Sequence, residues 1–174
     1  DEATTDAATT DAATTDVAAD PAAVRIESIR TYDPDGDDGV EGDDRVADAL
    51  DGDPTTAWRT SCYDNEWMGG KRGVGVVVTL DAAAARGVNV DVAHAPSVVQ
   101  FYASDADTVP ADLDDWGAPL LTRPVDGAQP TTFTSPVPAG PVRHLLVLVQ
   151  RLGPDPACSD ARPYRGALAD VRLS

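Results

Sequence analysis

Basic residues and long apolar runs are scarce in this chain. Of its 174 residues, 13 are lysine or arginine and 30 are aspartate or glutamate, which gives a formal net charge of −17. A surface with this charge repels nucleic acids and anionic lipid headgroups, so neither is an expected partner. The longest apolar run, residues 145–149, is far shorter than the roughly 18 apolar residues of a membrane-spanning helix. We therefore expect no direct membrane insertion by this part of the protein.

Recognised catalytic motifs are also missing. The sequence contains no Gly-x-Ser-x-Gly elbow, no His-Glu-x-x-His helix and no glycine-rich phosphate loop before a helix. His94 and His144 have no cysteine or aspartate at a recognisable ligand spacing, so we interpret each as a surface or packed histidine. With 30 acidic residues, paired carboxylates occur by chance and do not indicate a glycosidase. We expect no enzymatic activity.

The first part of the chain is a repeat of alanine, threonine and aspartate. Residues 1–20 have almost no large apolar side chain and cannot offset the entropy lost on ordering. We predict a flexible acidic linker over residues 1–22 and one folded domain over residues 23–174. Glycosylation and plain linker composition both explain the threonine pairs. Because Asp1 is not followed by a signal-like segment, we expect a fragment or mature form of a longer protein.

Alternation of apolar and polar side chains predicts about eight short strands. They cover residues 24–32, 74–80, 88–92, 98–102, 116–121, 131–133, 143–152 and 167–173. A short helix is predicted at residues 45–50, with Asp43 or Asp44 as its N-cap. The prolines between residues 124 and 141 restrict that region to sheet edges and turns. This pattern is typical of an all-β sandwich.

An acidic turn directly precedes Trp58, which is the expected anchor of the core. Its Asp-Gly and Asp-Pro pairs are turn signals. Asp51, Asp53 and Thr56 supply oxygen ligands of the kind that calcium prefers. Two interpretations stay open for the turn: a structural calcium, or side-chain hydrogen bonds within the turn and no metal. The acid-rich segment 33–44 departs from the calcium-loop pattern in its glycine and its last ligand, so we interpret it as a surface loop.

These residues carry a family resemblance. Residues 50–58 resemble the turn-and-tryptophan signature of galactose-binding-like, discoidin-type β-sandwiches. Residues 71–76, 147–152 and 168–173 follow in an order similar to the extracytoplasmic domain of actinobacterial MviN-type lipid II flippases and related kinase-like membrane proteins. The resemblance covers residues 26–173. It implies a galactose-binding-like jelly roll with a structural calcium at the three turn residues named above.

The only cysteines are Cys62 and Cys158. The sandwich interpretation places their two polar loops near each other, so we predict a disulfide between them. A disulfide implies an oxidising, extracytoplasmic setting. Two unrelated thiols are the alternative.

The same two polar loops contain the candidate ligand-binding residues. One loop supplies Tyr63, Asp64, Asn65, Trp67 and Arg72, and the other supplies Arg151, Asp160, Arg162 and Tyr164. Aromatic rings that stack on sugars, with charged or amide groups for the hydroxyls, are typical of carbohydrate sites. Trp67 is the main candidate because its neighbours are not core-like, and burial under the loop is the alternative.

The predicted function is that of a non-catalytic extracytoplasmic binding module of a larger membrane protein. By resemblance, its ligand is cell-wall glycan or a peptidoglycan precursor. The alternative is a protein-docking domain of a cell-wall synthesis complex, without sugar affinity. A dissociable glycan ligand distinguishes these two hypotheses.

Overall fold

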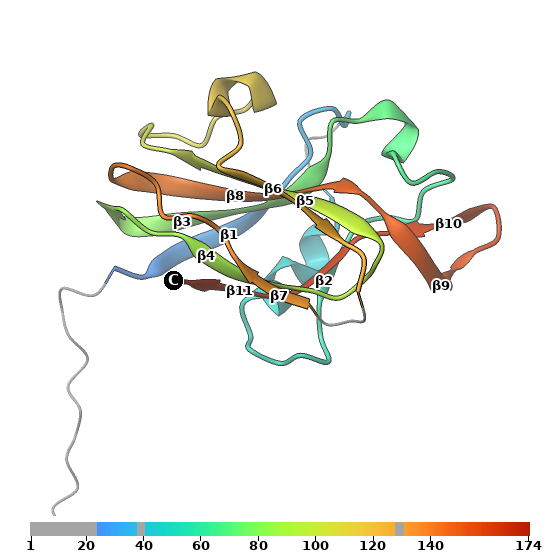
Figure 1. The fold of residues 1–174 in the computed structure, drawn as a ribbon. Coiled ribbons are helices and arrows are strands. Elements are labelled where there is room, and N and C mark those ends of the chain that lie inside the picture. Colours follow the sequence, from blue (N-terminus) through green and yellow to red (C-terminus); the bar gives the residue numbers. More distant parts are fainter. Residues whose placement is uncertain (1–23, 38–40, 128–130) are drawn as a thin grey trace, which may run out of the picture.

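The computed structural model describes residues 24–37, 41–127 and 131–174. Within these ranges the chain forms an antiparallel β-sandwich (Figure 1). One sheet has the strand order β1-β3-β8-β5-β6, and the facing sheet has the order β2-β11-β4-β7. The strands β9 and β10 form a separate two-stranded ribbon. The predicted all-β sandwich is confirmed, whereas the predicted linker at residues 1–22 lies outside the described residues.

The strands and helices have the following bounds. The five-stranded sheet contains β1 (Ile26–Tyr32), β3 (Val74–Ala84), β8 (Val142–Arg151), β5 (Ser97–Ser104) and β6 (Leu121–Val125). The four-stranded sheet contains β2 (Trp58–Arg59), β11 (Ala167–Leu173), β4 (Val88–Val92) and β7 (Thr131–Thr134). The ribbon contains β9 (Gly153–Ser159) and β10 (Arg162–Arg165). Short 3₁₀ helices, η1 (Asp43–Ala49), η2 (Met68–Gly70) and η3 (Leu113–Trp116), lie in the connections.

The central strands β3 and β8 are buried on both faces. Val76 and its alternate neighbours pack between the two sheets in the main core, together with Trp58 and Phe101. Val77 and Leu146 belong to a second cluster that includes residues of η3. A strand that is covered on both faces needs apolar side chains at nearly every position, and β3 and β8 have that composition.

Contacts of aromatic side chains stabilise the sandwich. The rings of Phe101 in β5 and Phe133 in β7 meet edge to face, with centroids 5.4 Å apart, across the two sheets. Trp58 is fully buried, and its indole N–H donates to the carbonyl oxygen of Glu41 at 2.8 Å. Because the indole has both apolar packing and a hydrogen-bond partner, the predicted role of Trp58 in the core is confirmed.

The predicted edge strand at residues 116–121 is wrong. Trp116 ends η3 and is buried, and its indole N–H donates to the Tyr32 hydroxyl at 3.2 Å. Gly117 has a φ of 72° and turns the chain, so that the edge strand β6 begins at Leu121. A left-handed φ of this kind favours glycine, which explains why the extended segment starts later than expected.

The predicted N-cap of the short helix is also wrong. Gly42 occupies the N-cap of η1, and no side chain caps the helix. A Cβ atom at Gly42 would lie 2.2 Å from the carbonyl oxygen of Arg59, so only glycine fits there. Asp43 and Asp44 lie in the first turn instead, where the positive end of the peptide dipoles favours them.

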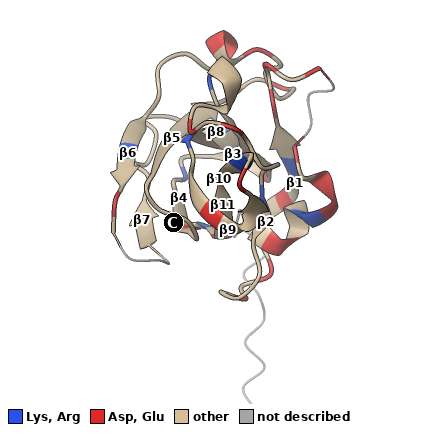
Figure 2. Ribbon diagram, turned by 90° about the vertical axis from the view of Figure 1, so that its right-hand side faces the viewer, with Lys and Arg blue, Asp and Glu red and all other residues tan. Residues whose placement is uncertain are grey.

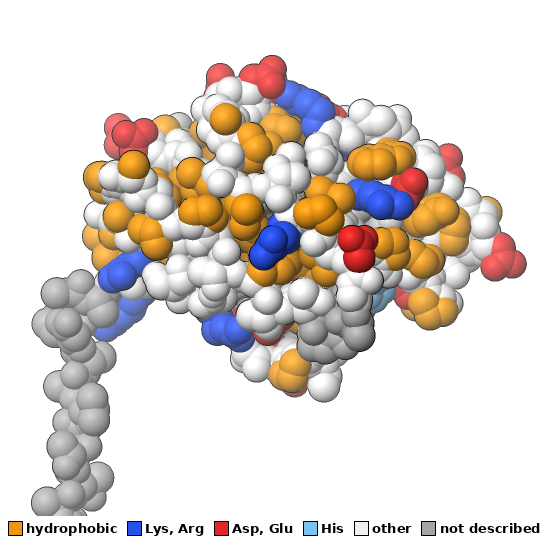
Figure 3. Space-filling model, in the orientation of Figure 1, with side chains coloured by type: hydrophobic (Ala, Val, Ile, Leu, Met, Phe, Trp, Pro, Cys, Tyr) orange, Lys and Arg blue, Asp and Glu red, His pale blue; other side chains and the backbone are white. Residues whose placement is uncertain are grey.

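Charge is concentrated at the periphery of the fold. Figure 2 shows many of the acidic residues on η1 and on the loops. On the face drawn in Figure 3, most acidic side chains lie towards the ends, and the middle is largely hydrophobic and uncharged with a few charged side chains among them. Among the described residues, no helix is long and apolar enough to cross a membrane.

Substitution of Gly75 tests the packing of the central strands. A Cβ atom at this position would lie 2.1 Å from the carbonyl oxygen of Val147 and 2.9 Å from the Cα atom of Leu148. Because both are backbone atoms of β8, we expect Gly75→Ala to lower the free energy of unfolding by about 3 kcal/mol. Urea denaturation measures this change. Gly140→Ala is the control, since a Cβ atom there meets nothing within 4 Å. Equal stability of the two variants would contradict the packing described here.

Candidate ligand-binding site

The ends of three strands bring the candidate loops to one end of the five-stranded sheet. Tyr32, at the end of β1, pairs with Gly75 near the start of β3. Gly75 also pairs with Leu148, near the end of β8. The loop after β1, the loop before β3 and the segment after β8 therefore lie side by side.

A disulfide connects two of these segments. Cys62 and Cys158 are bridged, with their Cα atoms 5.9 Å apart and a sequence separation of 96 residues. Next to the bridge, the Tyr63 N–H donates to the Tyr164 carbonyl at 2.8 Å, and the Tyr164 N–H donates to the Tyr63 carbonyl at 3.1 Å. The predicted disulfide is confirmed. Together with the paired backbone bonds, it keeps the 61–73 loop against the β9–β10 ribbon.

A polar pocket of about 400 Å³ lies beside the disulfide. Its lining consists of Asp33, Asp37, Glu41, Ser61, Cys62, Tyr63, Asp64, Lys71 and Arg162. Three of the predicted ligand-binding residues, Tyr63, Asp64 and Arg162, thus meet in one pocket although they come from both loops.

A hydrogen-bond network forms the floor of the pocket. The Lys71 ammonium lies 2.6 Å from an oxygen of Asp33 and donates to the Tyr63 hydroxyl at 3.1 Å. The Tyr63 hydroxyl donates to one carboxylate oxygen of Glu41 at 2.6 Å, and the Ser61 N–H donates to the other. Asp33 and Glu41 are buried. Because buried charges are costly unless paired and hydrogen-bonded, these contacts are what keeps both carboxylates in place.

The network sets the protonation states of the floor. Burial and the hydrogen bond to Glu41 raise the pKa of Tyr63, so its side chain stays a neutral phenol. Burial alone would lower the pKa of Lys71, but hydrogen bonds to Asp33 and Tyr63 outweigh burial and raise this pKa. The pocket therefore keeps an ammonium and a phenol at its floor across the physiological pH range.

Trp67 lies on the same loop as the pocket residues and is 48% exposed. Its backbone N–H donates to the Asn65 side-chain oxygen at 3.0 Å, and the Gly69 N–H donates to the same oxygen at 3.2 Å. The Arg151 guanidinium lies 5.7 Å from the indole centre and forms an ion pair with Glu66 at 2.6 Å. The indole is thus exposed, which is one of the two positions that the sequence left open, and contacts from its own loop and from β8 position it.

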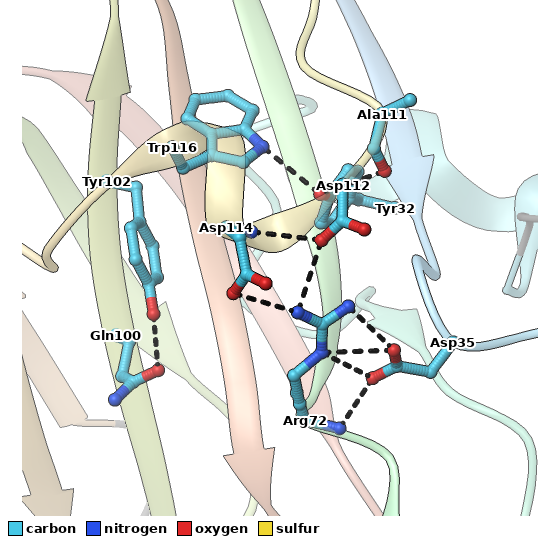
Figure 4. A network of polar contacts seen from close by, with 9 residues as sticks. All are labelled: Tyr32, Asp35, Arg72, Gln100, Tyr102, Ala111, Asp112, Asp114 and Trp116. Atoms are coloured by element: carbon cyan, nitrogen blue, oxygen red, sulfur yellow. Dashed lines mark hydrogen bonds and ion pairs between the residues drawn. The ribbon is translucent and has the colours of Figure 1, made fainter.

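Arg72 does not line the pocket. Its guanidinium contacts three carboxylates: Asp35 at 2.8 Å, and Asp112 and Asp114 each at 3.2 Å (Figure 4). These contacts connect η3 to the segment after β1. Since the guanidinium is already paired, the predicted role of Arg72 in ligand binding has no support from its position and stays a prediction.

Asp160 is exposed at the turn of the β9–β10 ribbon.

The sequence interpretation missed three residues of the pocket floor. Asp33 and Glu41 belong to the segment interpreted as a surface loop, yet both are buried because Lys71 and Tyr63 provide their partners. Lys71 had one signal, since it is the only lysine of the chain. Asp33 and Lys71 are 38 positions apart, so no local pattern shows that they meet.

A second polar cluster lies where β2, β9 and β10 approach the loop before β5. An Arg59 nitrogen is 3.1 Å from His94 Nε2, and Asp155 lies 3.7 Å from His94 Nδ1 and 3.4 Å from the Arg165 guanidinium. A guanidinium only donates, so His94 Nε2 accepts and the ring hydrogen is on Nδ1. Burial lowers the pKa of His94, which favours the same neutral form. His94 is therefore a packed histidine, which is one of the two interpretations made from the sequence. Its carboxylate partner, Asp155, was not predicted.

The turn before Trp58 is closed by its own hydrogen bonds. Asp51 accepts from the Asp53 N–H at 2.9 Å and from the Thr56 hydroxyl at 2.7 Å. Asp53 accepts from the N–H and the hydroxyl of Thr55 at 2.9 and 2.7 Å. Within the described ranges, no group of three or more His, Cys, Asp or Glu side chains is arranged to hold a metal ion. Calcium would need backbone carbonyls and water to complete its usual six to eight oxygens, and its presence stays a prediction.

Comparison with known proteins supports the fold. No family model matches the sequence. The carbohydrate-binding module CBM32 of AlyQ, solved in complex with 4,5-unsaturated mannuronic acid, superposes with a TM-score of 0.56 at 10% identity, covering 86% of this chain and 95% of that one. Chitosan-binding module 1 of a chitosanase/glucanase from Paenibacillus sp. IK-5 gives 0.51 at 18% identity, covering 84% and 93%. CpGH89CBM32-6 from Clostridium perfringens gives 0.51 at 9% identity, covering 85% and 94%.

These low identities establish a shared β-sandwich and no more. What each module binds is a property of that module. The resemblance to lipid II flippases and kinase-like membrane proteins is not tested by these structures and stays a prediction.

The calcium prediction has a direct measurement. If Asp51, Asp53 and Thr56 bind the ion, millimolar calcium raises the midpoint of thermal unfolding, because a ligand that binds only the folded state stabilises it. Chelator reverses the rise, and Asp51→Asn abolishes it. Asp107→Asn, an exposed aspartate in another loop, is the control and keeps the rise. If calcium leaves the midpoint of the unsubstituted protein unchanged, the prediction that the turn binds calcium is wrong.

Acidification is expected to destabilise the fold through its two histidines. Burial lowers the pKa of both His94 and His144 below the ordinary histidine value. The unfolded chain therefore binds protons at a higher pH than the folded chain. The corresponding stability is present above about pH 6.5 and is lost as the pH falls through the folded-state pKa values.

Urea denaturation at pH 7.5 and pH 5.5 measures this loss. We expect a lower free energy of unfolding at pH 5.5, and a smaller difference in the His94→Gln/His144→Gln double variant. A free energy that is equal or higher at pH 5.5 would contradict the buried neutral histidines.

Proposed function

We propose that this chain is a non-catalytic glycan-binding module that works outside the cytoplasm, with its ligand lying across Trp67 and the polar pocket. The observation that carries the proposal is the exposed indole of Trp67 on the loop that also lines the pocket. Tryptophan is usually largely buried, so an indole that its loop holds in the exposed position is suited to a ligand with an apolar face.

The pocket provides the polar half of a sugar site. Lys71 and Arg162 donate hydrogen bonds, whereas Asp37 and Asp64 accept them, so hydroxyl groups find both kinds of partner. A small number of placed polar groups beside an aromatic surface is the usual arrangement of small-ligand sites. The disulfide and the floor network order these groups before the ligand arrives, which reduces the entropy lost on binding.

Separate observations support the setting proposed for the module. The Cys62–Cys158 bridge is suited to an oxidising compartment. Several modules with this fold bind glycans, among them the module solved with 4,5-unsaturated mannuronic acid and the chitosan-binding module. We propose cell-wall glycan or a peptidoglycan precursor as the source of the ligand, and a membrane-anchored cell-wall protein as the carrier. The proposed ligand source and carrier protein rest on the sequence resemblance.

Removal of the exposed indole tests the site. We expect Trp67→Ala to weaken binding to purified cell-wall glycan at least about tenfold, because central aromatic contacts commonly carry 2 kcal/mol or more of a binding free energy. Trp67→Phe is expected to keep part of the affinity, since it retains an aromatic face. Saturable co-sedimentation, released by soluble glycan fragments, measures the affinity.

The matched control is Val137→Ala. Val137 is the other exposed large hydrophobic residue among the described residues and lies outside the pocket, so this variant is expected to bind like the unsubstituted protein. Full binding by Trp67→Ala would exclude the proposed site. Absence of any glycan binding would favour the protein-docking alternative.

A further inference from the structure

We propose that the pocket selects amino sugars with free, protonated amines over uronic acids. This inference rests on the proposed function, because it assigns a ligand class to the same site. It is carried by the distribution of charge between the floor and the mouth of the pocket.

The charges at the floor are largely compensated within the protein. Lys71 pairs with Asp33 at 2.6 Å, and the Glu41 carboxylate accepts from the Tyr63 hydroxyl and the Ser61 N–H. The third N–H of the ammonium has only a distant partner, Glu41 at 3.8 Å. Lys71 thus has one donor left for a ligand oxygen. The floor is suited to a hydroxyl group.

The charges at the mouth are less compensated. Asp37, Asp64 and Arg162 line the pocket and are exposed. Asp64 accepts from the Asn65 amide at 2.8 Å, and this neutral donor brings no positive charge to the carboxylate. No ion pair within the described ranges involves Asp37 or Arg162. Two carboxylates and one guanidinium therefore face an incoming ligand.

The lining as a whole has four carboxylates and two cationic side chains, in a chain whose formal net charge is −17. Such a field raises the local concentration of cations and lowers that of anions. An ammonium group on the sugar gains charge-assisted hydrogen bonds to Asp37 and Asp64. A sugar carboxylate gains a contact with Arg162 but meets two like charges, which is the repulsive element that specificity requires.

Calorimetric titration with three oligosaccharides of equal length tests the inference. The ligands are a chitosan oligomer with free amines, its neutral N-acetylated counterpart and an oligomannuronate, all at pH 6 and low salt. We expect the chitosan oligomer to bind at least about tenfold more tightly than the oligomannuronate, with the neutral oligomer between them. The preference should shrink as salt is added, because the mouth is exposed.

Two double variants separate the pocket from the overall charge. Asp37→Asn/Asp64→Asn should reduce the preference for the amine-bearing oligomer over the oligomannuronate at least about fivefold. Asp105→Asn/Asp107→Asn changes the net charge equally, in a loop outside the pocket, and should keep the preference.

Equal or tighter binding of the oligomannuronate would overturn the inference and leave the glycan-binding function standing. So would a preference that both double variants reduce equally. Failure of all three oligosaccharides to bind would contradict the proposed function itself.

Discussion

The candidate site depends on the contacts of one buried residue, Glu41, through both its backbone carbonyl and its side chain. Its carbonyl oxygen accepts from the indole of Trp58 at 2.8 Å, and its carboxylate accepts from the Ser61 N–H and from the Tyr63 hydroxyl. One residue thus connects the core tryptophan, the disulfide-bearing loop and the floor of the pocket. Removal of one partner from a buried, paired charge typically costs about 3–5 kcal/mol. The fold and the pocket are therefore maintained by the same contacts.

This arrangement separates the rigid part of the site from the part that meets a ligand. The floor is ordered by Glu41, Asp33 and Lys71, and the wall by the Cys62–Cys158 bridge. The exposed groups, Trp67 and the charges at the mouth, extend from this frame into solvent. A site built in this way loses little conformational entropy on binding, so a few contacts are enough for a useful affinity.

Much of the fold could be predicted from local patterns. The strands at residues 88–92 and 167–173 have the predicted bounds. In the first of them, alternation along the strand reflects burial of one face. The disulfide followed from the number of cysteines and the sandwich interpretation. For Trp67 the sequence left exposure and burial under the loop both open, and the structure shows the indole exposed.

The parts that could not be predicted depend on distant partners. Asp33 and Lys71 lie 38 positions apart, and Arg72 lies 40 positions from Asp112. The sequence identifies such residues as charged, but it does not show whether their charges face solvent or pair with another side chain. For the same reason, an acidic segment expected at the surface supplies two buried carboxylates, and a predicted ligand-binding arginine contacts η3 instead.

A crystal structure of the chain with a short glucosamine oligosaccharide tests the central claim most directly. The account predicts a sugar ring stacked on the indole of Trp67, a hydroxyl within hydrogen-bond distance of Lys71, and an amine between Asp37 and Asp64. A sugar bound at another surface, with the pocket beside the disulfide unchanged and filled only by water, would contradict it.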